Sequence, residues 1–159
     1  LITAAPCTLI PIHWIVYVLQ CTKLPVYRGA SADASGNVPI VTLVVPFPQH
    51  WILIHRWLYT RDCMKLLAGL LPLRALIQQM HGTAADDLSA SACIDALACV
   101  SLSVLLRLSL KIRATWHNGQ AIGVIADSFW QTVSRAWDLV VSAMVLRKAR
   151  APRAAPASA

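Results

Sequence analysis

The sequence predicts an α+β domain that is mainly α, with a short N-terminal β-hairpin packed on a helical bundle around a long central helix. Runs rich in β-branched residues fall in the first 45 positions, whereas apolar residues further along recur at helical spacing. The 159 residues suffice for one domain with a real core. We expect a single compact domain over residues 1–146 and a basic disordered tail over residues 147–159.

The N-terminal segment, residues 1–23, is apolar and is predicted to contribute a strand. Residues 12–19 (IHWIVYVL) are rich in β-branched and aromatic residues, which is typical of a buried strand. Residues 1–22 carry no formal charge and reach the roughly 20 residues that span a bilayer, although they contain two prolines. A membrane segment therefore stays open as an alternative.

The hairpin is predicted from two further runs. Residues 24–28 (LPVYR) and 38–45 (VPIVTLVV) have the composition of strands, and the Gly/Ser/Asp-rich residues 29–37 between them are of loop type.

Helices are predicted from residue 51 onward. An apolar stripe at spacings of three and four runs through residues 51–59. Asp62 is a suitable N-cap for a short helix over residues 63–71, and another short helix is expected over residues 73–81. Pro72 separates these two.

The long central helix is predicted over residues 86–117, with Asn118-Gly119 as its stop signal. Its apolar stretch 88–106 is a second membrane candidate, but Asp95 near the middle favours a buried helix. The last helix is expected from a capping box at Ser128 to about residue 147.

Composition limits the class of partner. Hydrophobic residues make up 57% and charged residues 13%, which excludes a chain that is disordered throughout. The net charge is +7, and all seven acidic residues are Asp. Such a surplus favours acidic partners, namely nucleic acid, anionic lipid or an acidic protein surface, unless it reflects coding bias toward Ala, Arg and Pro.

No motif for catalysis, metal or cofactor binding is present in the sequence. The five cysteines include no C-x-x-C pair, so neither a disulfide framework nor a zinc site is indicated, and a reducing intracellular compartment, nuclear or cytoplasmic, is expected. The nucleophile-elbow and phosphate-loop patterns are absent, and H-E-x-x-H is impossible without Glu. We therefore predict a protein that is not an enzyme, with no cofactor and no small-molecule substrate.

Two groups of residues are candidates for partner binding. Trp57 lies off the apolar stripe of its helix, between Arg56 and Arg61, and large aromatics beside arginine are common at interfaces. The second group is basic and could contact nucleic acid or simply be solvated: Arg147, Lys148, Arg150 and Arg153.

Several short motifs follow one another in a familiar order. They are LPVYRG at 24–29, VPIVTLVVPFP at 38–48, IHRWLYTRD at 54–62, LLAGLLP at 66–72 and TWHNGQAIG at 115–123. This order resembles the clampless family of basidiomycete fungi. The resemblance implies a regulator of sexual development that is needed for clamp-cell formation, acts downstream of mating-type homeodomain proteins and works through contacts with other regulatory proteins.

Overall fold

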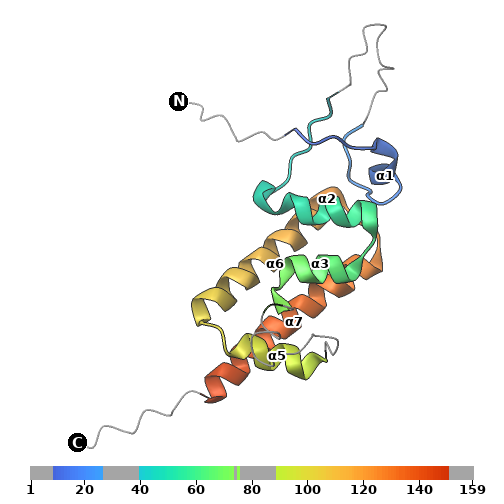
Figure 1. Ribbon diagram of the computed structural model, residues 1–159. Helices are drawn as coiled ribbons and strands as arrows, with labels where there is room; N and C mark the ends of the chain where they lie inside the picture. The colour runs from blue at the N-terminus through green and yellow to red at the C-terminus, as the bar shows by residue number, and fades with distance from the viewer. Residues whose placement is uncertain (1–8, 27–39, 74, 76–88, 151–159) are drawn as a thin grey trace, which may run out of the picture.

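The computed structural model describes residues 9–26, 40–73, 75 and 89–150, and its regular elements are helices (Figure 1). In chain order they are α1 (Trp14–Val18), the 3₁₀ turn η1 (Pro48–His50), α2 (Trp51–Thr60), α3 (Cys63–Leu70), α5 (Ala90–Ala98), α6 (Leu102–Ile122) and α7 (Asp127–Arg150). The two long helices α6 and α7 run side by side in opposite directions. Helices α2 and α3 cross them on one side, with α1 at the upper end and α5 at the lower end.

The predicted α+β class is wrong, because the described part of the chain contains no β-strand. Residues 24–26 and 40–45 are irregular, and the loop 27–39 lies outside the described residues. From residue 40 to 45, exposed and half-buried side chains alternate, and Leu43 and Val45 pack on the helical core. The alternation therefore marks a chain segment lying on helices, since alternating burial needs a packing surface but no partner strand.

The described part of the N-terminal segment, residues 9–23, is also not a strand. One turn of helix, α1, replaces it and turns Tyr17 into the core, where the side chain is 1% exposed. The following residues then meet the loop between α6 and α7 through an isolated antiparallel bridge between Cys21 and Val124. This pairing holds the N-terminal segment against the end of the long helices.

The predicted central helix is divided in two. Helix α5 ends at Ala98, and α6 starts after Ser101, whose hydroxyl accepts a hydrogen bond from the Val104 amide at 3.4 Å. A capping serine satisfies an amide that a new helix leaves free, so the break is stabilised locally. The break also allows α5 to pack across α7.

Helix α6 then continues past the predicted stop at Asn118-Gly119 and ends at Ile122. Gly123 follows it with φ of 69°, a left-handed conformation that glycine adopts without steric cost. A Cβ on Gly119 would lie 2.7 Å from the Phe129 ring, so this glycine permits the close approach of α6 and α7. The pair Asn-Gly therefore serves packing rather than a turn.

The short helices agree with the sequence. Helix α2 occupies the predicted stripe, and the Asp62 carboxylate accepts from the Lys65 amide at 2.9 Å as the expected N-cap of α3. Residues 76–81 of the next predicted helix are outside the described ranges. Helix α7 extends to Arg150, so the first four residues of the predicted tail are helical, and residues 151–159 are not described.

The core lies where α2, α3 and α5 meet the two long helices. Trp57, Phe129, Leu97 and Val133 are among its side chains, each at most 1% exposed. None of the helices in the described ranges is long and apolar enough to cross a membrane, including those that cover part of the candidate stretch 88–106.

Candidate functional site

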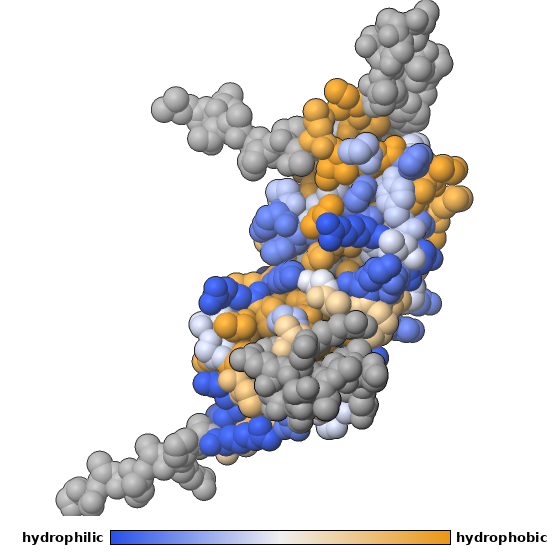
Figure 2. Space-filling view, in the orientation of Figure 1, coloured by the Kyte–Doolittle hydropathy of each residue, from blue (hydrophilic) through white to orange (hydrophobic). Residues whose placement is uncertain are grey.

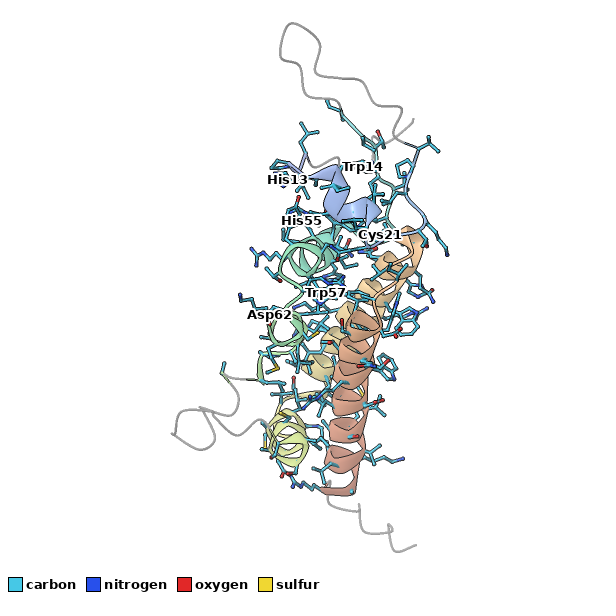
Figure 3. The ribbon with its side chains drawn as sticks, turned by 90° about the vertical axis from the view of Figure 1, so that its right-hand side faces the viewer. His13, Trp14, Cys21, His55, Trp57 and Asp62 are labelled. Atoms are coloured by element: carbon cyan, nitrogen blue, oxygen red, sulfur yellow. The ribbon has the colours of Figure 1, made fainter. Side chains whose placement is uncertain are left out.

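The first predicted partner-binding group lies at the end of α2, and its central residue is inside the protein. The Trp57 side chain is 1% exposed, and its ring centroid is 5.1 Å from that of Phe129 on α7. Figure 3 shows Trp57 between α2 and the long helices. Its indole nitrogen has no hydrogen-bond partner among the described residues. The indole thus contributes to the core, and only its neighbours Arg56 and Arg61 reach the surface.

Arg61 covers the buried indole. Its guanidinium carbon lies 4.6 Å from the Trp57 ring centroid, within the range of a cation–π contact. The same guanidinium donates to the Gln20 side-chain oxygen, while the Gln20 amide donates to the Leu58 carbonyl at 2.8 Å. Arg61 is therefore engaged in joining α2 to the N-terminal segment.

The C-terminal basic residues lie at the other end of the helix pair, so the two predicted groups do not form one surface (Figure 1). Arg147 donates to the carbonyls of Ala98 and Val100, at 3.3 and 2.7 Å, and so satisfies acceptors at the end of α5. Arg150 pairs with Asp95 at 2.7 Å. Lys148 is exposed, and Arg153 is outside the described residues.

A shallow pocket of about 280 Å³ lies between the N-terminal segment and α2, lined by Pro11, Ile12, His13, His55 and Tyr59. Two hydrogen bonds beside the pocket join the N-terminal segment to α2. The Tyr17 hydroxyl lies 2.7 Å from Nδ1 of His55, and the His13 amide donates to the Tyr59 hydroxyl at 2.6 Å. His13 and His55 lie beside α1 in Figure 3.

Burial governs the protonation of His55 and Tyr17, the two side chains joined beside this pocket. It lowers the pKa of His55, and the nearby Arg56 lowers it further, so the neutral imidazole is favoured. Burial also raises the pKa of the Tyr17 hydroxyl above its usual value, which keeps the phenol protonated. The described residues include no group of three or more metal-binding side chains. The arrangement fixes α1 against α2 through hydrogen bonds between neutral groups.

Asn118 is an important residue that the sequence did not reveal. Its side chain is fully buried and forms two hydrogen bonds with one residue, Phe47: Nδ2 donates to the Phe47 carbonyl at 2.7 Å, and Oδ1 accepts from the Phe47 amide at 2.9 Å. This pairing fixes the chain just before η1 and α2 onto α6, near the C-terminal end of that helix. In the sequence, Asn118-Gly119 predicts a turn that ends the helix, and this signal does not point to a pairing with Phe47.

Exposed apolar side chains form a surface on the two long helices. Trp116 of α6 and Trp130 of α7 are in edge-to-face contact, with ring centroids 4.9 Å apart. Residues seven apart lie on nearly the same side of a helix, so this side continues to Leu102, which is two such steps before Trp116, and to Trp137, one step after Trp130.

We call this surface the α6–α7 face and define it by Leu102 and Leu106 of α6 and Trp137 and Val141 of α7. Their exposed fractions are 52, 49, 43 and 39%. On α7 the neighbouring Val133 and Val140 are buried instead, at 1 and 0% exposed, because they lie on another side of the helix from Trp137 and Val141.

A second apolar area covers α1. Figure 2 shows hydrophobic residues gathered at the upper end of the molecule, where Ile15, Val18 and Leu19 are each about half exposed or more.

These features define a small helical domain whose buried polar groups secure the fold and whose long helices present an apolar face. Comparison with known sequences gives the family. Residues 64–159 match the family described as the Clampless protein 1 C-terminal domain, and the chain belongs to that family. No solved structure matches the chain significantly.

Two curated relatives are proteins named Clampless protein 1 from two strains of Cryptococcus neoformans var. neoformans serotype D. Each is 26% identical to this chain over 105 residues, which is 66% of this chain and 20% of the relative. The chain thus corresponds to about a fifth of those proteins.

Proposed function

We propose that this protein is a non-enzymatic regulator of fungal sexual development, required for clamp-cell formation, that acts through contacts with other proteins. Membership of the Clampless protein 1 C-terminal domain family is the observation that carries the developmental part of the proposal. The relatives are named Clampless protein 1, and residues 64–159 of this chain match the C-terminal domain of that family.

The α6–α7 face supports the protein-contact part of the proposal. Isolated apolar side chains are common on protein surfaces, whereas adjacent ones on two paired helices are typical of an interaction site. A large aromatic residue, Trp137, lies among them, and tryptophan often dominates the energy of protein interfaces.

Genetic complementation in a clamp-forming dikaryon tests the proposal. Deleting the gene in both mating partners should abolish clamp connections, and the intact chain should restore them. A variant with Leu106→Gln and Trp137→Gln should fail to restore them although it accumulates normally, because the face is disrupted.

The matched control carries Met64→Gln and Ile52→Gln. Met64 lies on α3 and Ile52 on α2, and their exposed fractions, 49 and 43%, equal those of Leu106 and Trp137. This control should restore clamps. Normal clamps in the deletion strain would refute the developmental role, and full rescue by the Leu106/Trp137 variant would refute the use of this face.

A further inference from the structure

We propose that the α6–α7 face binds an acidic amphipathic helix of a partner protein. This inference rests on the proposed function in protein contacts and adds the chemistry of the partner. The face has a shape that fits a helix. The charges around it fit an acidic partner and disfavour other occupants.

The shape of the face fits a helix. Leu102 and Leu106 on α6, and Trp137 and Val141 on α7, are each separated by four residues, so they form two parallel apolar rows on neighbouring helices. Leu102 and Leu106 are about 6 Å apart along the axis at 1.5 Å per residue. The side of α6 that begins at Leu102 and ends at Arg113 is about 17 Å long, which is about three turns of a partner helix. An amphipathic helix presents a stripe of this length with anchors at similar spacing.

Each row continues into a cation. Arg113 is seven residues after Leu106, and Lys148 is seven residues after Val141, so each lies on the same side of its helix as the apolar row. Because α6 and α7 are antiparallel, the two cations lie at opposite ends of the face. Both are exposed, and among the described residues Arg113 makes a long 3.5 Å contact from its Nε to the His117 ring.

Few anions compensate these cations. Helix α6 contains no acidic residue, and Asp138 of α7 lies next to Trp137, toward the outer edge of the face. The acids Asp62 and Asp95 pair with Lys65 and Arg150 elsewhere on the molecule. A partner with acidic residues at both ends of its apolar stripe would therefore be complementary in charge.

The same charges disfavour two other occupants. A symmetric dimer would bring the cationic ends of one face against those of the second copy. Anionic membranes are held by clusters of about four to eight cations, and the described residues supply two on this face.

Binding of two designed helical peptides tests the proposal. Both carry leucines at heptad spacing over three turns; one has glutamates flanking the stripe at both ends, and the other has lysines there. With the full chain, the Glu peptide should bind at least roughly tenfold more tightly than the Lys peptide. This preference should shrink as salt is raised, because screening weakens exposed charge pairs.

Charge reversal supplies the decisive variant. Arg113→Glu combined with Lys148→Glu should reverse the preference between the two peptides, since each attraction becomes a repulsion. The control Arg135→Glu changes an exposed arginine of α7 that lies two residues from Trp137, on another side of the helix, and should keep the original preference. Circular dichroism checks that all variants remain helical.

Three outcomes would overturn the proposal. They are equal binding of both peptides, a face-dependent dimer in sedimentation, and face-dependent binding to phosphatidylserine vesicles without peptide binding. These results are independent of the clamp assay. If the Leu106/Trp137 variant fails in the dikaryon but the peptides show no charge preference, the proposed function stands and the acidic helix is wrong.

Discussion

Asn118 shows how a single residue can join two distant parts of the chain. Its carboxamide matches the amide and carbonyl of Phe47, which is 71 residues away, and the Asn118 side chain itself is fully buried. Hydrophobic packing alone would allow the segment before α2 to slide along α6. Two directional bonds to one residue define a single position.

Replacing Asn118 with alanine should lower the free energy of unfolding by about 2 to 4 kcal/mol, because each buried polar group that loses its partner costs about 1 to 3 kcal/mol. Urea denaturation followed by circular dichroism measures the change. Gln120→Ala, at an exposed position of the same helix, is the control and should leave stability nearly unchanged. Equal stability of the two variants would show that the Phe47 pairing contributes little.

Residue patterns predicted some contacts and missed others for a physical reason. Asp62 was identified as a cap because a cap depends on three neighbouring residues. Trp57 and Asn118 depend on partners far along the chain, Phe129 and Phe47, which periodicity cannot reveal. For this reason Trp57 was expected at an interface and instead packs in the core, while Asn118 was interpreted as a helix stop.

At the level of elements, the break between α5 and α6 is the most informative departure from the sequence prediction. The run from 88 to 106 is apolar throughout except for Asp95 and its serines, so periodicity favours one helix. Serines 89 and 101 accept from the amides of Ala92 and Val104 and start two helices. Arg147 then satisfies carbonyls where α5 ends.

Ser101→Ala should therefore destabilise the protein by about 1 kcal/mol, the usual cost of losing an N-cap. Ser101→Asp should retain most of the stability, since a carboxylate can also accept from Val104 and is favourable at a helix N-terminus. Ser134→Ala, at an exposed position within α7, is the control. An alanine variant more stable than the wild type would instead favour a continuous helix.

The missing hairpin has a similar origin. The composition of residues 24–28 and 38–45 predicted strands, whereas residues 40–45 alternate in burial against helices. The composition of a short apolar segment does not show which surface it packs on. Helix α2 was predictable from its stripe at helical spacing and α3 from its N-cap Asp62, because a stripe and a cap are properties of the element itself.

At the level of the whole molecule, the N-terminal segment is joined to the bundle in two regions. Hydrogen bonds of His13, Tyr17 and Gln20 reach α2, and residues 20–23 pair with 122–125. Both attachments are local, whereas α6 and α7 are packed along their length. The segment should therefore open at lower free energy than the rest of the fold.

Acidification should promote this opening. The pKa of His55 is lowered in the folded protein, so the unfolded or opened state takes up a proton first as pH falls below about 6.5. Stability should thus be fully present above that pH and decrease below it, until the folded-state pKa is reached. His50, whose pKa is also lowered by burial and by Lys111, adds an effect of the same sign.

Hydrogen exchange at pH 7 and pH 5 measures the effect. Protection factors of the Cys21 and Thr22 amides, which bond to Tyr17 and Gly123, should fall more than those of amides within α6. His55→Gln does not titrate and can still accept from Tyr17, so it should remove most of the additional loss, whereas His50→Gln should not. Uniform loss across all helices would contradict local opening.

The pairing of the N-terminal segment with the α6–α7 loop also has a consequence for synthesis. The Thr22 hydroxyl bonds to the carbonyl of Gly123, which is translated 101 residues later. Translation proceeds at about 5 to 20 residues per second, so the site to which the segment binds is synthesised roughly 5 to 20 s after the segment itself. During that interval its apolar residues are available to chaperones, so the first part of this fold to be made is among the last to be completed.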